Sequence, residues 1–233
     1  MVDVTTRPDP IAHEVLAAVL QVRSGSLRTL LWERGQEPHA HRWSLPGGRL
    51  GATEDVETSI KRQLAEKVDL STVSHVEQLA TFSAPDRVPG PRVLATAFLA
   101  TVPADIDPVV PDDTAWHPVE RLPVTAFDHE AIVLRARDRL AAKLSYTNIG
   151  FALAPPSFTI SALRELYSAA LGYPVSATNL QRVLTRRQLL EPTGDTAPPG
   201  RSGGRPAALF RFVNSGIEVT DPFAVLKPPT SAP

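Results

Sequence analysis

Short apolar stretches separated by turn-forming residues run through the first half of the chain and predict a β-sheet. Residues 14–22 and 27–33 are apolar and flank Arg-Ser-Gly-Ser, a pattern that predicts a β-hairpin. Residues 41–50 predict a short strand followed by a Pro-Gly-Gly loop. Residues 74–83 and 92–102 predict two further strands.

A helical period replaces this pattern between residues 54 and 68. Val56, Ile60, Leu64 and Val68 recur at every fourth position, which places them on one face of a helix. Strands and a helix in this order predict a domain of the α/β class.

A second helix is predicted to begin at Asp128 and to run to about Leu144. The Asp128 carboxylate is expected to cap this helix by accepting hydrogen bonds from backbone N–H groups. Phe127 and Ile132 occupy the two positions of a hydrophobic staple around the cap. We therefore interpret residues 128–145 as a helix that links two domains.

The C-terminal part has the element order of a winged helix-turn-helix domain. Residues 147–153, 161–171 and 177–190 predict three helices, and a loop rich in Gly, Pro and Arg follows at residues 194–206. A strand is predicted from Ala207 to Phe212. Three helices followed by a hairpin are typical of a winged helix.

These patterns predict four segments along the chain. The first is an α/β domain over residues 1–127, and the linker helix over residues 128–145 follows it. The winged helix-turn-helix domain is predicted over residues 146–217. The proline-rich tail, residues 218–233, is expected to be disordered.

The net charge of the chain is −1, but the charge is unevenly distributed. Residues 11–130 hold 11 Lys and Arg against 17 Asp and Glu, whereas residues 131–215 hold 11 against 4. The basic part therefore predicts a polyanionic partner. The absence of cysteine excludes disulfides and cysteine-based zinc sites. With no secretory signal and no long apolar run, the sequence predicts a soluble cytoplasmic protein.

From Gly48 onward the sequence resembles the Nudix box, whose pattern is G-x5-E-x7-R-E-U-x-E-E-x-G-U with U an aliphatic residue. The resemblance covers about residues 12–125 and implies the Nudix-type α/β/α sandwich. The matching residues are Gly48, Glu54, Arg62, Leu64, Glu66 and Leu70, and the departing residues are Gln63, Lys67 and Asp69.

Three positions of this box determine whether it can hydrolyse a pyrophosphate. Hydrolysis at neutral pH needs Mg²⁺, which hard anionic oxygens hold and which activates a water molecule. Gln63, Glu66 and Lys67 share the helix face where three carboxylates are expected. Because an amide and an ammonium replace two of them, we predict no catalytic residue, no metal site, no required cofactor and no hydrolase activity. The alternative is an active hydrolase in which Glu54 or Glu57 replaces the missing metal ligands.

A binding cleft can persist after catalysis is lost. Trp43 is suited to stack on an adenine and Arg49 to meet a diphosphate, with core packing and plain solvent exposure as the alternative roles. The two glycines before Arg49 permit close approach of the backbone to a phosphate. Arg62 and Glu54 are instead expected to form an ion pair that braces the helix. The predicted effector-binding residues are Trp43, Gly47, Gly48, Arg49, Glu66, Arg87 and Arg92.

The helix predicted over residues 177–190 has an apolar face and a polar face. Leu180, Val183 and Leu184 form the apolar stripe, and Ser176 is the expected N-cap. Amides and guanidinium groups on the polar face are those that read adenine and guanine edges in the major groove, although a solvated arginine-rich helix is the alternative. The predicted DNA-binding residues are Thr178, Asn179, Gln181, Arg182, Thr185 and Arg186 on the helix, Lys143 and Arg187 as phosphate contacts, and Arg201 and Arg205 in the wing.

The whole arrangement resembles the Nudix-related transcriptional regulators of NAD metabolism, the NrtR family. Besides the altered box, the stretches that carry the resemblance are residues 126–129, 143–147, 187–193 and 204–209. The resemblance implies a homodimeric repressor of NAD-biosynthesis or salvage genes that binds a palindromic double-stranded operator. It also implies ADP-ribose or a related nucleotide as the effector. An active ADP-ribose pyrophosphohydrolase with a basic appendage and an RNA-binding Nudix protein are the alternatives.

Overall fold

A computed structural model describes residues 11–68, 73–198 and 206–221 of the chain. The side chains of Lys67 and Val68 also lie outside this description. The chain divides into two compact units, and we describe each by itself. Unit 1 comprises Met1–Val19, Thr29–Ala100 and Pro108–Ala136, and unit 2 comprises Leu20–Arg28, Thr101–Asp107 and Arg137–Pro233.

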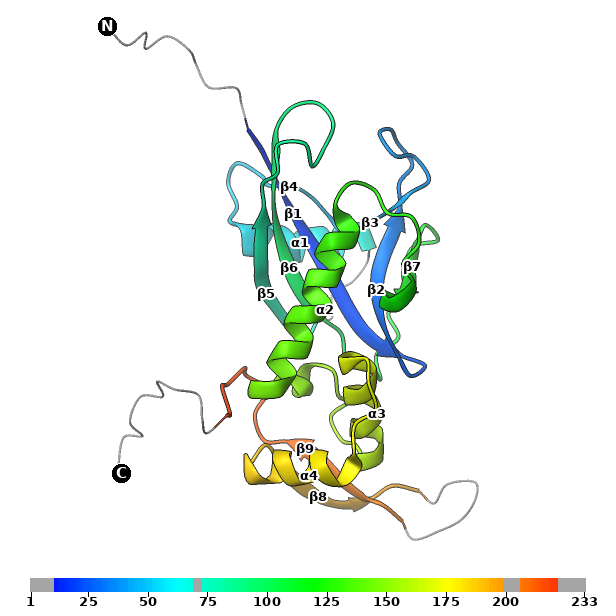
Figure 1. Cartoon of the computed structure of the whole chain (residues 1–233), viewed down its shortest axis with the longest axis vertical. Helices are drawn as coiled ribbons and strands as arrows, with labels where there is room; N and C mark the ends of the chain where they lie inside the picture. The colour runs from blue at the N-terminus through cyan, green and yellow to red at the C-terminus, as the bar shows by residue number, and fades with distance from the viewer. Residues whose placement is uncertain (1–10, 69–72, 199–205, 222–233) are drawn as a thin grey trace, which may run out of the picture. The chain divides into compact units, whose positions relative to one another are not determined.

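A seven-stranded sheet forms the first part of the chain, with the strand order β3-β2-β1-β6-β5 and with β4 and β7 pairing with β1 and β2 (Figure 1). The central strands β1 and β6 are buried along nearly their whole length, and they supply a large share of the apolar core of the sheet. The strands are β1 Ala12–Arg23, β2 Ser26–Glu33, β3 Trp43–Ser44, β4 Gly47–Arg49, β5 His75–Phe82, β6 Val93–Thr101 and β7 Thr114–Pro118.

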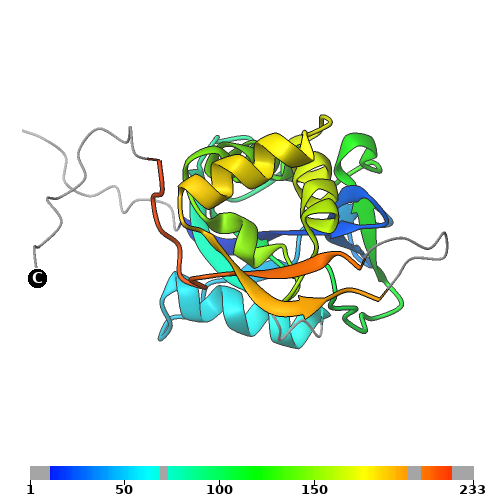
Figure 2. The ribbon, with the colours of Figure 1, turned by 90° about the horizontal axis from the view of Figure 1, so that it is seen from below.

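Two helices cover the faces of this sheet. Helix α1, Val56–Val68, lies on one face, and the start of helix α2, His129–Tyr146, lies on the other (Figures 1 and 2). Ile60 and Leu64 of α1 are fully buried, as the apolar period predicts. Helix α1 begins two residues later than predicted because Asp55 caps it, accepting from the Thr58 N–H at 2.7 Å. This layering agrees with the predicted α/β/α sandwich.

The Pro-Gly-Gly segment is not the loop that the sequence predicts. Its two glycines begin strand β4, which pairs antiparallel with β1, so that Gly47 lies opposite Leu16 and Gly48 opposite Val15. Gly47 has a φ of 153°, and a Cβ atom there would lie 2.1 Å from the Val15 carbonyl oxygen. Glycine is therefore required at this position by the close approach of two strands.

The start of α2 also differs from the prediction. The Asp128 carboxylate does not cap the helix; both of its oxygens accept hydrogen bonds from Arg87, at 2.8 and 2.9 Å. Phe127 has a φ of +53°, an uncommon conformation for a bulky residue. The guanidinium is a stronger donor than an N–H group at a helix end, and it takes the carboxylate away from the backbone.

Unit 2 contains the winged-helix elements. Helix α3, Ile160–Leu171, begins at the capping side chain of Thr159 and ends at Gly172, whose φ is 77°. Helix α4, Ala177–Arg186, has Ser176 as its N-cap, as predicted. A two-stranded antiparallel sheet follows, made of β8 Leu190–Thr196 and β9 Ala208–Phe212. The short 3-10 helix η2, Ile149–Ala152, lies within the helix predicted over residues 147–153, and the other short 3-10 helix, η1 Val119–Arg121, belongs to unit 1.

The predicted helix over residues 177–190 is too long at its C-terminal end. Helix α4 stops at Arg186, and Gln188, with a φ of 56°, turns the chain into β8. Leu190 then pairs with Phe212 of β9. Leucines and arginines favour a helix locally, but the pairing with a distant strand determines the structure of this segment.

The first residues of the predicted disordered tail are ordered. The Glu218 N–H donates to Asn148 Oδ1 at 2.7 Å, and the Thr220 N–H donates to the Tyr146 carbonyl at 2.8 Å. These bonds hold residues 218–221 against the end of α2, and residues 222–233 lie outside the described part of the chain. In the residues that the structure describes, no helix is long and apolar enough to cross a membrane.

Candidate functional site

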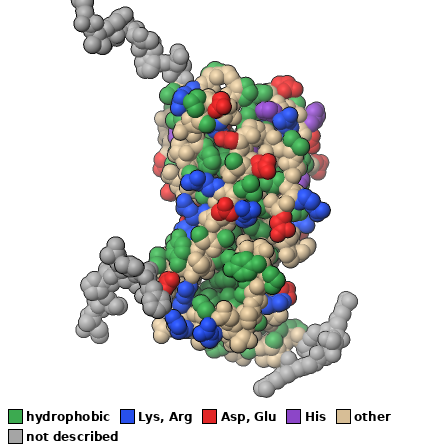
Figure 3. Space-filling model, in the orientation of Figure 1, with side chains coloured by type: hydrophobic (Ala, Val, Ile, Leu, Met, Phe, Trp, Pro, Cys, Tyr) green, Lys and Arg blue, Asp and Glu red, His purple; other side chains and the backbone are tan. Residues whose placement is uncertain are grey.

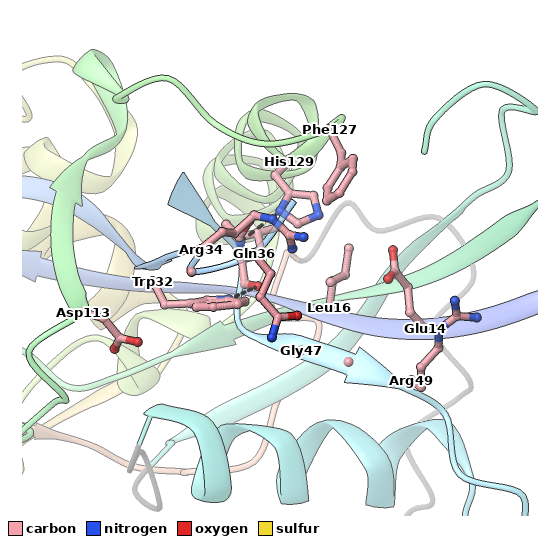
Figure 4. A pocket seen from close by; sticks show the side chains of 14 residues that line it. Glu14, Leu16, Trp32, Arg34, Gln36, Gly47, Arg49, Asp113, Phe127 and His129 are labelled. Carbon is pink, nitrogen blue, oxygen red and sulfur yellow. Dashed lines mark hydrogen bonds between the residues drawn. The ribbon is translucent and has the colours of Figure 1, made fainter. Parts of the chain in front are cut away.

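A cavity of about 800 Å³ opens in unit 1 between β1, β2, the β3–β4 segment and the start of α2 (Figure 4). Trp32 and Phe127 give it two aromatic walls, and Arg34 and Arg49 add two cations. The remaining lining residues are Glu14, Leu16, Gly35, Gln36, Ser44, Leu45, Gly47, Gly48, Asp113 and His129.

The aromatic and cationic side chains of the cavity are arranged around Arg34. Its guanidinium carbon lies 4.9 Å from the centroid of the Phe127 ring and 6.0 Å from that of Trp32. The Trp32 indole N–H donates to the Leu45 carbonyl at 3.1 Å, which fixes the ring in the wall. Figure 4 shows these side chains converging from β2 and from the start of α2.

His129 closes the inner end of the cavity as a neutral imidazole. It is almost fully buried, and its Nδ1 accepts from the Leu45 N–H at 3.0 Å. Burial, with smaller contributions from the positive charges of Arg87 and Arg34, lowers the pKa of His129 to about 3. An acceptor at Nδ1 agrees with the neutral form. His129 therefore ties the first turn of α2 to the β3–β4 segment.

This combination of groups is suited to a nucleotide. Aromatic rings can stack on a base, and guanidinium groups bind phosphates as charged forks. The Glu14 and Asp113 carboxylates can accept from ribose hydroxyls. Gly47 and Gly48 bring the backbone to the cavity without side chains in the way.

The structure brings only some of the predicted effector residues to the cavity. Gly47, Gly48 and Arg49 line it, whereas Trp43 is not among its described lining residues. The Trp43 ring packs on His117 with 4.1 Å between centroids. Trp32 supplies the indole instead, and the sequence contains no local signal that distinguishes the two tryptophans.

The other predicted effector residues have partners away from the cavity. The Arg87 side chain is 1% exposed and forms ion pairs with Glu14 at 2.7 Å and Asp128 at 2.8 Å. Arg92 donates to the Ser83 carbonyl at 3.1 Å. Glu66 pairs with Arg62 on the outside of α1. These positions argue against direct contact of Arg87, Arg92 and Glu66 with a ligand in this cavity.

The face of α1 that corresponds to a Nudix metal site is filled by other interactions. Gln63 is buried, and its amide donates to the Arg49 carbonyl at 3.4 Å. Arg62 binds Glu54 at 2.6 Å and Glu66 at 2.9 Å, which confirms the predicted brace. The hydrogen bond from Arg62, followed by one from Gly51, lowers the pKa of Glu54 to about 2.

The side chains on this face of α1 do not fit Mg²⁺, the ion that the Nudix fold implies. In the described residues, no three His, Cys, Asp or Glu side chains are grouped so that they could hold a metal ion. A buried amide takes the place of one carboxylate, and arginine already engages the two carboxylates nearby. The side chain of Lys67 lies outside the described part.

In unit 2, helix α4 presents a polar face to solvent. Leu180 and Leu184 are buried and Val183 is half-buried, which confirms the predicted apolar stripe. Arg182 donates to Asn179 Oδ1 at 2.8 Å, so these two side chains support each other. The exposed polar residues of α4 are Thr178, Asn179, Gln181, Arg182, Thr185 and Arg186.

The predicted phosphate contacts are placed less favourably. The Arg187 side chain is 15% exposed, donates to the Ser145 carbonyl at 2.8 Å and lies 3.9 Å from Asp221, which argues against a phosphate contact there. Lys143 is half-buried in the last turn of α2. Arg201 and Arg205 lie outside the described residues. On the face shown in Figure 3, hydrophobic side chains gather over unit 2 beside Lys and Arg side chains.

Comparison with known proteins identifies both units. Residues 12–136 match the family model of the NUDIX domain, and residues 150–212 match that of the NrtR DNA-binding winged helix domain. The chain is 29% identical to the "ADPR responsive transcriptional repressor NtrR" of Acinetobacter baylyi over 88% of this chain and 83% of that protein.

Solved structures give the same assignment along nearly the whole chain. The crystal structure of Shewanella oneidensis NrtR matches with a TM-score of 0.74 and 30% identity, over 86% of this chain and 93% of that one. The same protein in complex with a 27mer DNA matches with a TM-score of 0.72 and 29% identity, over 85% and 92%. These matches confirm a Nudix α/β fold followed by a winged helix domain. The chain therefore belongs to the NrtR family.

Proposed function

We propose that the chain is a DNA-binding transcriptional repressor whose Nudix domain senses ADP-ribose or a related NAD-derived nucleotide and does not hydrolyse it. The single observation that carries the proposal is the polar face of α4. Its amides, hydroxyls and guanidinium groups are exposed on a helix that two buried leucines anchor. Its setting is a family whose Shewanella oneidensis member has been crystallised with DNA.

Helix α4 supplies the groups that read bases in this proposal. Arg182 and Arg186 can form paired hydrogen bonds to guanine, and Asn179 and Gln181 can do so to adenine. The Ser176 cap leaves other N–H groups of the first turn near a phosphate. Arg201, Arg205 and Lys143 extend the contact along the backbone. A homodimer would place two such helices about 34–36 Å apart on a palindromic operator.

The cavity of unit 1 is the effector site in this proposal. Its rings, its two arginines and its carboxylates match the base, the diphosphate and the ribose hydroxyls of ADP-ribose. The name of the Acinetobacter baylyi relative supports this ligand, because it describes that protein as ADPR responsive. The genes controlled would be those of NAD biosynthesis or salvage, in keeping with the family resemblance.

The loss of hydrolysis follows from the α1 face. Two of the three expected carboxylate positions hold Gln63 and Lys67, and Arg62 engages the carboxylate of Glu66. A lysine at a ligand position opposes a divalent cation by charge. We further propose residues 1–127 as the sensor, 128–145 as the linker helix and 146–217 as the DNA-binding domain.

Fluorescence anisotropy tests the proposal directly. The probe is a labelled duplex from the promoter beside the chain's own gene, with a scrambled duplex as the reference, each with and without ADP-ribose. We expect preference for the promoter duplex and a change in its affinity when ADP-ribose is added. Equal binding to both duplexes, or no effect of ADP-ribose, would contradict the proposal.

A pair of arginine variants makes the test specific to α4. Arg182→Ala removes a base-reading candidate, whereas Arg164→Ala removes a half-buried arginine of α3 that pairs with Glu165. Both lower the positive charge of unit 2 equally. The proposal requires that Arg182→Ala lose promoter affinity and that Arg164→Ala retain it.

A further inference from the structure

Residues 127–129, which we call the α2 junction, lie between the cavity and helix α2. Phe127 and His129 both line the cavity. Between them, Asp128 is held by the buried Arg87, and His129 is held by the Leu45 N–H. A bound ligand therefore meets the residues that determine how α2 begins.

Phe127 is the strained member of the junction. Its φ of +53° costs a bulky side chain conformational energy, and such a residue keeps this conformation only when its surroundings hold it there. The neighbouring residues are anchored, because the Ala126 N–H donates to the Trp43 carbonyl at 2.8 Å and Arg87 holds the Asp128 side chain. The ring itself is held by side chains of the cavity.

Arg34 is the side chain that holds the Phe127 ring. Its guanidinium carbon lies 4.9 Å from the ring centroid, and its Nε donates to the Pro38 carbonyl at 3.1 Å. His39 packs edge-on against the same ring with 4.9 Å between centroids. Arg34 therefore has two roles: it supports the strained Phe127, and it is one of the two arginines that line the cavity.

We propose that Arg34 and Phe127 form the trigger through which the cavity reports its occupancy to α2. When an anionic phosphate enters, the Arg34 guanidinium turns from the Phe127 ring to the phosphate. Phe127 then loses part of its support and relaxes from its left-handed conformation, which reorients the first turn of α2. This inference rests on the proposed function, since it explains how a bound nucleotide would alter DNA binding.

The direction of this exchange follows from the strength of the two contacts. A guanidinium binds a phosphate through paired, charge-assisted hydrogen bonds, which are stronger than a partly exposed cation–π contact. Arg87 does not take part, because its side chain is buried and engaged by two carboxylates. The exchange therefore falls to Arg34, while Arg87 keeps Asp128 as the fixed point of the junction.

The far end of α2 offers a route from the junction to the reader. Helix α2 is continuous over 18 residues, and the carbonyl of Ser145 in its last turn accepts from Arg187, which directly follows α4. The Tyr146 carbonyl accepts from Thr220. A change at the start of the helix can thus reach the residue that anchors the end of the recognition helix.

Two substitutions at position 127 distinguish the effect of the backbone strain from the effect of the contact between Arg34 and the ring. Phe127→Gly accepts a φ of +53° without strain, so the junction has no tendency to relax, and ADP-ribose should change operator affinity by less than about twofold. Phe127→Leu keeps the strain and removes the ring that Arg34 supports. It should bind the operator weakly even without ADP-ribose, as the wild type does with ligand. Phe82→Leu, at the end of β5 and outside the cavity lining, is the matched control.

The readout is the ratio of operator Kd with and without saturating ADP-ribose, measured beside the ADP-ribose affinity of each variant. A purely structural role for Phe127 would lower thermal stability in both variants and leave this ratio at its wild-type value, typically about 5–150-fold for allosteric coupling. Wild-type ratios in both variants would overturn the trigger. A wild-type chain that shows no response to ADP-ribose would instead refute the proposed function itself.

Discussion

Two arginines of unit 1 and two of unit 2 differ sharply in their partners. In unit 1, Arg62 and Arg87 each bind two carboxylates and brace the fold. In unit 2, Arg182 and Arg186 stand exposed on α4. The same side chain is a structural element where carboxylates surround it, and where it faces solvent it is free for the recognition role that we propose. Position and partners, more than residue type, therefore separate the sensor from the reader.

The largest effect is expected from the buried arginine of unit 1. Arg87→Ala leaves the Glu14 and Asp128 carboxylates without their partner, which should lower the free energy of unfolding by about 3 kcal/mol. All three tryptophans lie in unit 1, so tryptophan fluorescence during urea unfolding follows this unit. Arg92→Ala, an exposed arginine bound to one carbonyl, is the control and should change little. An equal loss of unfolding free energy in the two variants would contradict the structural role assigned to Arg87.

The next effect concerns the exposed arginines of α4. Arg182→Ala and Arg186→Ala should each weaken operator binding by about 1–3 kcal/mol if they read bases, with little change in the stability of the chain. Anisotropy titrations at two salt concentrations make the measurement. If the loss were the same for specific and scrambled duplexes, these arginines would be phosphate contacts and α4 would not be the reader.

The buried imidazole of unit 1 gives a pH-dependent effect. Its pKa is about 3 in the folded chain and near the ordinary value of 6.5 when unfolded, so only the unfolded chain binds this proton between those values. Stability should fall as the pH is lowered from 6.5, by about 1 kcal/mol per pH unit. The pKa of Glu54 is lowered from 4.5 to about 2, so the stability that Glu54 contributes is lost only when the pH falls below 4.5.

The pH window from 6.5 to 5 therefore separates the effect of His129 from that of Glu54. His129→Gln is the matched variant, and its stability should vary less with pH over this range. The measurement is urea unfolding followed by tryptophan fluorescence at several pH values. An equally steep pH dependence in the variant would show that another group titrates and that His129 is not the neutral, buried residue described above.

The smallest expected signal is catalysis. With Mg²⁺ or Mn²⁺ the chain should show no appreciable hydrolysis of ADP-ribose, because Gln63 and Lys67 occupy ligand positions. Phosphate release after treatment with a phosphatase measures it. The double substitution Gln63→Glu and Lys67→Glu is the gain-of-function comparison. A wild-type turnover of about 1 s⁻¹ or more would restore the hydrolase alternative.

Much of the fold could be predicted from local sequence. The apolar runs around Ser24 and Gly25 specify a hairpin, and both turn residues have positive φ, as a two-residue type I′ turn requires. The spacing from Gly48 to Leu70 specifies α1 and its place in the fold. These features depend on residues close together in the chain, which is why sequence patterns contain them.

The cavity depends on contacts that local patterns do not contain. Trp32 lies opposite Ser44 in the β2–β3 pairing and both line the cavity, whereas Trp43, the neighbour of Ser44 in β3, lies on the other face and packs on His117. Arg87 becomes a buried brace because Glu14 and Asp128 come from distant parts of the chain. Helix α4 likewise ends before the predicted residue 190, because residues 190–196 form β8 and pair with β9, which comes later in the chain.

The most direct test of the account is a pair of calorimetric titrations, with ADP-ribose added to the free chain and to the chain saturated with operator. The central claim is that the cavity of unit 1 and the reader of unit 2 are coupled, and coupling between two binding sites is reciprocal. We predict that operator weakens ADP-ribose binding by the same factor by which ADP-ribose weakens operator binding. Identical ADP-ribose affinities in the two titrations would contradict the claim and leave a DNA-binding protein with an uncoupled Nudix domain.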